Sequence, residues 1–204
     1  MPEVAAATRD AARSLERLGA TLVEIELPSL KYAVGAWFAV CFSEFLSYHQ
    51  RYLRRDLFSQ YGPANQVFLS AAQHVGTVDY LQAQRLRRTI IREFDAAFEK
   101  VDAILAPSAP NEAHSLAEEV AASDFPTRKT PAGELSIAYL AVQLTGPANL
   151  AGLPSLQVPM GVSAAGLPLG MQMMGRPGAE EELYPIGEAL EQAVGIFRRL
   201  PMLM

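Results

Sequence analysis

The sequence predicts an α/β fold in which helices flank a mixed β-sheet. Three patterns point to it: apolar side chains recur at helical spacing in several segments, other short segments alternate apolar with polar residues, and the two kinds of segment alternate along the chain. The chain has 204 residues, half of them apolar. A chain of this length can bury roughly 70% of the surface it exposes when unfolded, so a disulfide or a metal is not needed for folding.

Helices are predicted at four places. The first covers residues 3–18, where Val4, Ala11, Leu15 and Leu18 share a face and Gly19 stands where the helix would end. A second is expected over residues 33–60, closed by Pro63. Asp79 and Gln82 resemble a capping box that opens a third helix. The last begins after Ala179, and Pro185 fits it only within the first turn.

Strands are predicted from period-two alternation and from short apolar runs. Leu22–Leu27 alternates Val23, Ile25 and Leu27 with two glutamates, and Ala103–Ala106 reads as a central parallel strand. Two interior strands are expected around Leu156–Met160 and Leu169–Met173, joined by a turn at Ala165–Leu167. The intervening residues 108–134 are polar and loop-like.

The charges are unevenly distributed, because none of the 39 charged residues falls between Leu135 and Gly175. Prolines interrupt this stretch, and no run of 18 apolar residues survives in it, which argues against a membrane span. The stretch instead predicts buried sheet with tight connections that contain glycine.

Composition excludes several classes of function. The formal charge of -5 argues against nucleic acid as a direct partner. The single cysteine, Cys41, lies among apolar residues and reads as a packed, inert thiol, so a reducing cytoplasm is expected. The charged N-terminal residues contain no apolar signal core. His49, His74 and His114 are far apart, and no nucleotide-binding motif occurs, so we expect neither a metal nor another cofactor.

Two motifs near the C-terminus carry a resemblance to a known family. Residues 145–161 read TGPANLAGLPSLQVPMG, and residues 166–175 read GLPLGMQMMG. Both closely resemble the C-terminal signature of the amidase signature family. Weaker matches occur in the family's order at Leu18–Pro28, at Gly76–Tyr80 with Ala83 and Arg87 or Arg88, and at Val101–Pro110. The resemblance covers nearly the whole chain.

The resemblance implies an amidohydrolase that cleaves a carbon-nitrogen bond. Family members use a serine nucleophile, a second serine and a neutral lysine, with an oxyanion hole of backbone N–H groups. This chain has no adjacent serines, and its three lysines, Lys31, Lys100 and Lys129, stand in other contexts. No catalytic residue is therefore carried over. Residues 1–204 are expected to be the C-terminal portion of an amidase-signature domain whose N-terminal catalytic core is absent.

The signature residues can be either architectural or pocket-forming. Candidates for the substrate pocket are Val142, Thr145, Gly146, Pro147 and Asn149. Residues expected to set turns or to allow close packing are Gly146, Pro147, Gly152, Pro154, Pro159, Gly161, Gly166, Pro168 and Gly170, with Gln172 as a further motif residue. Asn149 could also cap a backbone turn.

Two positions bear on the substrate. Glutamine-specific relatives, which serve as the A subunits of tRNA-dependent amidotransferases, carry an aspartate at the position of Val142 and an arginine near that of Gln66. An apolar side chain cannot pair with an ammonium group, so the resemblance favours a less polar small amide. The alternatives are a fragment of such an amidotransferase protein and a non-catalytic domain that binds an amide or dimerises. The expected partners are the small amide, the missing N-terminal half or a second copy.

Overall fold

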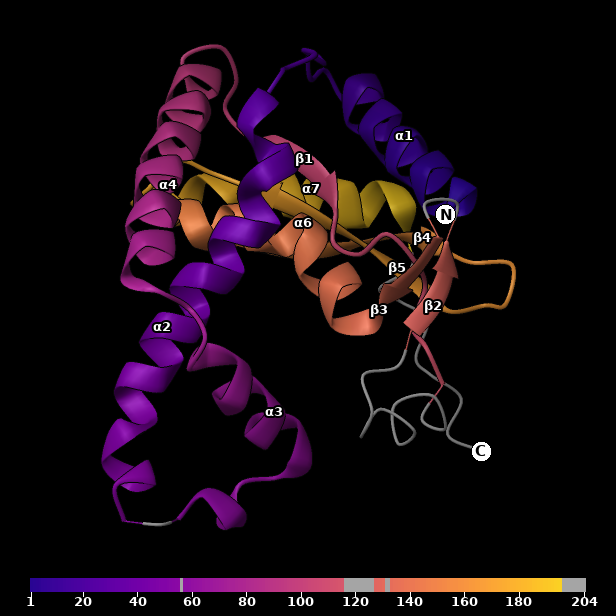
Figure 1. Ribbon diagram of the computed structural model, residues 1–204. Coiled ribbons are helices and arrows are strands. Elements are labelled where there is room, and N and C mark those ends of the chain that lie inside the picture. Colours follow the sequence, from indigo (N-terminus) through magenta and orange to yellow (C-terminus); the bar gives the residue numbers. More distant parts are fainter. Residues whose placement is uncertain (56, 116–126, 131–132, 196–204) are drawn as a thin grey trace.

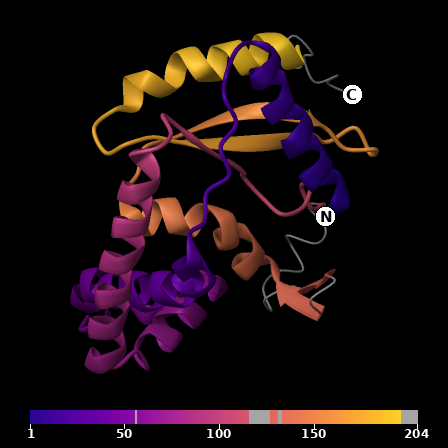
Figure 2. The same cartoon turned by 90° about the horizontal axis from the view of Figure 1, so that it is seen from above.

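The computed structural model describes residues 1–55, 57–115, 127–130 and 133–195. Its elements in chain order are α1 (Pro2–Arg17), η1 (Pro28–Tyr32), α2 (Ala33–Leu53), η2 (Phe58–Gln60), α3 (Pro63–Ala72), α4 (Thr77–Phe98), β1 (Ile104–Pro107), β2 (Thr127–Thr130), β3 (Gly133–Ser136), α6 (Ile137–Ala151), β4 (Ser155–Val162), β5 (Pro168–Met174) and α7 (Glu180–Val194). The α/β class is confirmed, and helices lie on both sides of the main sheet (Figures 1 and 2).

The main sheet has three strands in the order β1-β5-β4, and both pairings are antiparallel. The predicted hairpin is confirmed: β4 and β5 pair from Ser155 with Met174 to Val162 with Pro168. The prediction of a central parallel strand over 103–106 is wrong, because β1 lies at the edge and runs antiparallel to β5. A separate two-stranded ladder joins β2 to β3. It begins inside the segment 108–134 that was expected to be a loop and ends at Ser136, just beyond it.

Two apolar cores lie on opposite faces of the main sheet. On one face, Val158, Met171 and Met173 pack with Leu15 of α1 and Leu190 of α7. The other face meets α2, α4 and α6, where the buried residues include Ala33, Ile90, Phe94, Ile104 and Met174. Figure 2 shows the resulting layers, with α7 and α1 above the hairpin and α6, α4 and α2 below it. Alternation along β5 thus sends adjacent methionines into different cores.

Several predicted boundaries shift. The helix expected over 33–60 ends at Leu53, and Pro63 starts α3 rather than closing the region, as a proline in a first turn can. The capping box lies one turn earlier than expected: Gly76 is the cap, and its N–H donates to Asp79 Oδ2 at 3.1 Å. Pro185 lies inside α7, beyond the first turn. Residues 22–27 form no strand.

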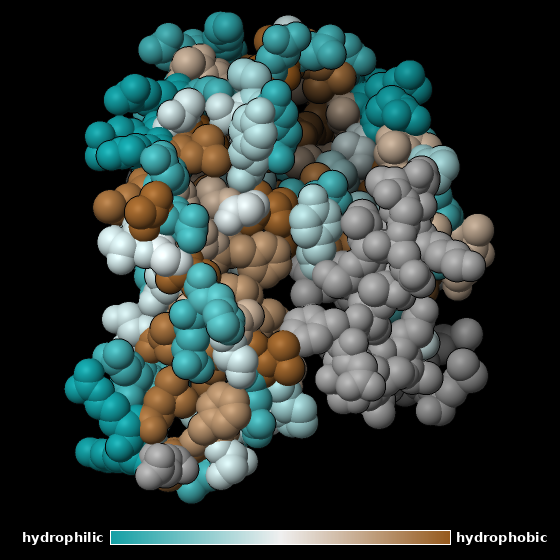
Figure 3. Space-filling model, viewed as in Figure 1, coloured by the Kyte–Doolittle hydropathy of each residue, from teal (hydrophilic) through white to brown (hydrophobic). Residues whose placement is uncertain are grey.

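The C-terminal part of α2, together with α3, forms an arm that extends from the layered body (Figure 1). Aromatic rings line it, with Phe42 5.7 Å from Phe68 and His49 5.2 Å from Tyr61 between ring centroids. Apolar side chains are visible over this arm in Figure 3. Within the described part of the chain, every helix is too short or too polar to cross a membrane.

Candidate functional site

The predicted pocket residues fall on one helix, α6. Gly146 and Pro147 were expected to set a turn or to allow close packing, and the turn part of that prediction is wrong because both lie within Ile137–Ala151. Pro147 has no N–H for the carbonyl of Gln143, so it removes one bond from the helix ladder. The uncharged stretch therefore contains this helix as well as the hairpin. Gly146 and Pro147 disfavour a helix locally, so packing of α6 against other elements must stabilise it.

The C-terminal end of α6 is fixed from two sides. Gly152 has a φ of +77°, and the N–H groups of Gly152 and Leu153 both return to the Ala148 carbonyl, at 2.9 and 3.0 Å. Arg87 of α4 donates from Nε to the Leu150 carbonyl at 2.7 Å. A cation at this end satisfies a carbonyl that has no partner in the helix and opposes the negative end of the helix dipole.

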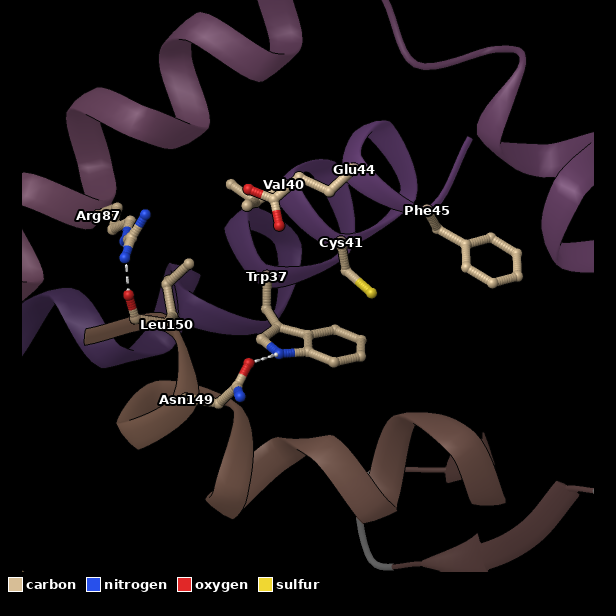
Figure 4. A pocket seen from close by; sticks show the side chains of 8 residues that line it. All are labelled: Trp37, Val40, Cys41, Glu44, Phe45, Arg87, Asn149 and Leu150. Atoms are coloured by element: carbon tan, nitrogen blue, oxygen red, sulfur yellow. Dashed lines mark hydrogen bonds between the residues drawn. The ribbon is translucent and has the colours of Figure 1, made fainter. Parts of the chain in front are cut away.

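Trp37 of α2 contacts the same helix. Its indole Nε1 donates to Asn149 Oδ1 at 2.8 Å. A Cβ placed on Gly146 would lie 3.6 Å from the indole ring, so the ring packs on the backbone of α6 one turn before Asn149. Figure 4 shows the indole between α2 and α6, with its N–H directed at the asparagine. Asn149 thus accepts a bond from another helix instead of capping a turn.

A cavity of about 380 Å³ opens beside this contact. It is lined by side chains from α2, α4 and α6: Trp37, Val40, Cys41, Glu44, Phe45, Arg87, Asn149 and Leu150 (Figure 4). Burial raises the pKa of the Cys41 thiol, and the Glu44 carboxylate raises it further. The thiol is therefore a poor nucleophile near neutral pH, as the sequence predicts.

The chemistry of the cavity suits binding rather than cleavage. Indole, phenyl and aliphatic groups form an apolar wall, while a carboxylate, a guanidinium and an amide supply polar contacts. Such a lining fits a small molecule with an apolar body and one hydrogen-bonding end. No serine or lysine is among the described lining residues, so the groups that the family uses for bond cleavage are not found there.

Of the pocket candidates, only Asn149 lines this cavity. Val142 is half-buried on the same helix face, with its Cβ beside Gly146. Thr145 is half-buried and Pro147 is buried. Gln66 lies on α3 and donates to the Tyr61 carbonyl at 2.7 Å. A direct role of Val142, Thr145, Gly146 and Pro147 in substrate binding stays a prediction.

The sheet supports α6 through Gln172. This buried side chain on β5 donates from Nε2 to the Leu144 carbonyl at 3.2 Å. Nearby, a Cβ on Gly170 would lie 2.2 Å from Nε2 of Gln157 on the neighbouring strand, so any larger residue there would require the Gln157 side chain to move. Both motif residues act in the packing of strand against strand and strand against helix.

The other structural motif residues lie in the hairpin and its approach. Pro154 accepts a bond from the Gly175 N–H at 3.0 Å, and a register shift follows Pro159, before Gly161. A Cβ placed on Gly161 would lie 3.6 Å from the Cβ of Ala7, an ordinary contact distance. Gly166 has a φ of +80° in the hairpin turn, where its N–H donates to the Ser163 carbonyl at 2.8 Å. The turn expected at Ala165–Leu167 is confirmed.

A second cavity of about 290 Å³ lies between the loop after β1, the N-terminal end of α1 and the hairpin. Ser108 lines it, and its buried hydroxyl has no hydrogen-bond partner among the described residues. His114, Gln157 and Gly170 also line it. The described residues contain no group of three metal-binding side chains in this cavity or elsewhere.

Comparison with known proteins identifies the family. The family model described as Amidase matches residues 1–184. The chain belongs to this amidase family. It is 39% identical to the A subunit of the glutamyl-tRNA(Gln) amidotransferase of Myxococcus xanthus, over 97% of this chain and 43% of that protein. The corresponding protein of Moorella thermoacetica is 36% identical, over 99% of this chain and 43% of that protein.

Solved structures support the assignment of this chain to the amidase family. A crystal structure of an amidase superposes with a TM-score of 0.80 at 26% identity, covering 95% of this chain and 42% of that one. The A subunit of the Thermotoga maritima glutamyl-tRNA(Gln) amidotransferase gives a TM-score of 0.71 at 28% identity, over 95% and 39%. This amidase-family chain therefore spans about two fifths of the length of the relatives it matches.

Sequence reasoning missed Trp37 as a partner of α6. The two bonded residues are 112 positions apart, and no local pattern connects them. Arg87 belonged to the resemblance at Gly76–Tyr80, but its role at the end of α6 depends on tertiary packing. The one available signal was that Trp37 is the only tryptophan in the sequence.

Proposed function

We propose that this chain forms the substrate-pocket part of an amidohydrolase that cleaves the carbon-nitrogen bond of a small, weakly polar amide. The serine pair and the lysine would come from the rest of the amidase domain. The observation that carries the proposal is the cavity at the Trp37–Asn149 contact, because it places a residue of the signature beside an apolar wall and a few polar groups. The chain alone would bind the amide without hydrolysing it.

Val142 supports the preference for a weakly polar amide over glutamine. It is an uncharged side chain at the position where the family resemblance places an aspartate in glutamine-specific members. An isopropyl group offers no charge to the ammonium of glutamine, and burying that ammonium against it would cost several kcal/mol. Val142 lies on the same helix as Asn149 but outside the cavity lining, so the group of the substrate that extends from the cavity to Val142 is expected to be apolar.

The curated relatives favour a second candidate function. The two named above belong to glutamyl-tRNA(Gln) amidotransferases and are 39% and 36% identical to this chain. A protein of that lineage would act on glutamine and would assemble with further subunits. The Val142 side chain argues against it, and a direct comparison of substrates separates the two.

The test uses a hybrid in which this chain replaces the aligned part of the Myxococcus xanthus protein. Release of ammonia is measured with hexanamide, benzamide and glutamine. We expect hydrolysis of the first two and little of glutamine, and Val142→Asp should raise the relative rate with glutamine whereas the uncharged Val142→Asn should not. A hybrid that prefers glutamine with Val142 in place would favour the amidotransferase. Hydrolysis by the purified chain, above a heat-denatured sample, would contradict the proposal.

A further inference from the structure

The cavity beside Ser108, which we call the Ser108 cavity, is separate from the cavity at the Trp37–Asn149 contact. It has a volume of about 290 Å³, and the described lining residues of the two cavities do not overlap. The loop after β1, the N-terminal end of α1, the first turn of α6 and the hairpin surround it, and Figure 1 shows that end of α1 beside the hairpin. Its volume is close to the lower end of the range for ligand pockets, about 300 Å³. The proposed function uses none of its described lining residues.

One wall of the Ser108 cavity is apolar. It is formed by buried side chains from four elements, namely Val4 of α1, Leu140 of α6, Met160 of β4 and Leu169 of β5. Because four elements supply the wall, tertiary packing fixes its shape. A hydrocarbon group that lies against it is removed from water, which favours binding. The wall therefore suits the apolar part of a small ligand.

Two polar side chains meet at Gly170, at another wall of the cavity. A Cβ on that glycine would lie 3.2 Å from Ser108 Oγ and 2.2 Å from Gln157 Nε2. The Ser108 hydroxyl is buried and has no hydrogen-bond partner among the described residues. Within the same part of the chain, the side chain of Gln157 makes no hydrogen bond either. Buried hydroxyls are normally paired, so Ser108 is a donor that the described residues leave without an acceptor.

The two groups differ in their access to solvent. Gln157 is exposed, whereas the hydroxyl of Ser108 is closed to solvent. A ligand reaches the hydroxyl when the amide of Gln157, the end of a flexible side chain, turns to admit it. A hydroxyl and an amide NH₂ are both donors, and a carbonyl oxygen has two lone pairs. One carbonyl oxygen can therefore accept a bond from each residue.

The charges around the cavity favour a neutral ligand. Among its described lining residues there is no lysine or arginine, whereas the carboxylate of Glu112 is present. His114 also lines the cavity, but it already has another interaction partner. A carboxylate moved into this site would lose its water without gaining a cation, and that loss is much larger for a charge than for a neutral carbonyl.

We infer that the Ser108 cavity is a second binding site, which takes a small neutral carbonyl compound. The hydrocarbon part of the compound lies against Leu140 and Met160, and its oxygen accepts hydrogen bonds from the Ser108 hydroxyl and the Gln157 amide. The site is independent of the amide pocket assigned under the proposed function, because the two cavities have different walls.

The first test is a titration of the full chain with cyclohexanone, followed through the methyl NMR signals of its methionines. Met160 lines the cavity, whereas Met174 is buried in the core on the other face of the sheet and is the internal control. The Met160 signal should move saturably and the Met174 signal should stay in place. Cyclohexanecarboxylate should bind at least about tenfold more weakly. A Met160 signal that stays in place or moves in step with Met174 would overturn the inference, as would equal affinity for the carboxylate.

The second test removes the two donors one at a time. Ser108→Ala and Gln157→Leu should each weaken cyclohexanone binding about two- to tenfold, the range for one neutral hydrogen bond. Ser155→Ala, at an exposed position on the same strand as Gln157, is the matched control and should bind like the parent. Parent-like affinity in Ser108→Ala or in a folded Gln157→Leu would overturn the inference. Ser108→Ala removes only an unpaired hydroxyl and should fold, so the test does not depend on the folding of Gln157→Leu.

A third variant separates this inference from the proposed function. Asn149 lines only the other cavity, so Asn149→Ala should bind cyclohexanone like the parent. Weaker binding in that variant, with Ser108→Ala unaffected, would place the ligand in the other cavity and overturn the inference. An inactive hybrid would count against the proposed function alone, because binding at Ser108 does not require hydrolysis.

Discussion

The indole of Trp37 on α2 donates a 2.8 Å hydrogen bond to the side-chain oxygen of Asn149 on α6. This bond joins a residue of the family signature to a helix far away in the chain. It lies beside the cavity, and the same ring rests on the backbone at Gly146. The contact therefore holds the part of α6 that contains Gly146 and Asn149 against α2.

Replacing Asn149 by alanine should leave the indole N–H without its acceptor. We expect the free energy of unfolding to fall by about 1 kcal/mol, the usual net value of such a bond. Because Trp37 is the only tryptophan, its indole gives a single nitrogen-hydrogen NMR signal, which should move in Asn149→Ala. Asn65→Ala, on the exposed surface of α3, is the control. An unmoved indole signal in Asn149→Ala would show that the bond is not formed.

Arg87 and Arg88 are neighbours on α4 with different surroundings. Arg87 donates to the Leu150 carbonyl at 2.7 Å, whereas Arg88 is exposed. Arg87→Gln should lower the free energy of unfolding in urea by about 1.5–3 kcal/mol, the range for bonds to charged groups. Arg88→Gln should change it by less than about 0.5 kcal/mol. Equal effects of the two substitutions would mean that Arg87 does not hold the end of α6.

The side-chain hydroxyls of Ser108 and Ser163 differ in their hydrogen bonding. The buried Ser108 hydroxyl lacks a partner among the described residues, whereas Ser163 accepts a bond from the Leu167 N–H at 3.2 Å. Removing an unpaired buried hydroxyl relieves its desolvation, so Ser108→Ala should stabilise the free chain by about 1 kcal/mol. Ser163→Ala should destabilise it by a similar amount. Calorimetry compares the two, and destabilisation by Ser108→Ala would reveal a partner for that hydroxyl.

Cys41 should react slowly with iodoacetamide. Burial, and secondarily the charge of Glu44, raises its pKa above the ordinary value, so at about pH 8 the reactive thiolate is scarcer than in a free cysteine. The profile of rate against pH should therefore lie to the alkaline side of that for a cysteine peptide. The substitution Glu44→Gln should move this profile part of the way back towards that of the peptide, whereas Glu24→Gln should leave it unchanged. A profile on the acidic side would contradict the assigned surroundings.

The elements that the sequence predicts well are those whose pattern is complete within a short segment. Helix α1 and the β4–β5 hairpin follow from their own periodicity, and Gly166 marks the turn between the strands. The α6 helix was missed because Gly146 and Pro147 disfavour helix locally, while packing against Trp37 and Arg87 overrides that preference. The strand at residues 22–27 was wrongly predicted because a strand needs a partner as well as a pattern.

The site was predicted less completely than the fold. The signature directed attention to α6, and Asn149 does line a cavity. The rest of that lining comes largely from α2 and α4, and their approach to α6 depends on contacts between residues far apart in sequence. The family resemblance supplied the chemistry that the composition alone could not.

The most direct measurement of the pocket assignment is a titration of Trp37 fluorescence in the purified chain. If the cavity is the substrate pocket, hexanamide should change the emission saturably, because its alkyl chain can lie against the apolar wall. Glutamine, which lacks such a chain, should change the emission less at the same concentration. Asn149→Ala should weaken the response to hexanamide. An emission that no amide alters, or one that only glutamine alters, would contradict the assignment.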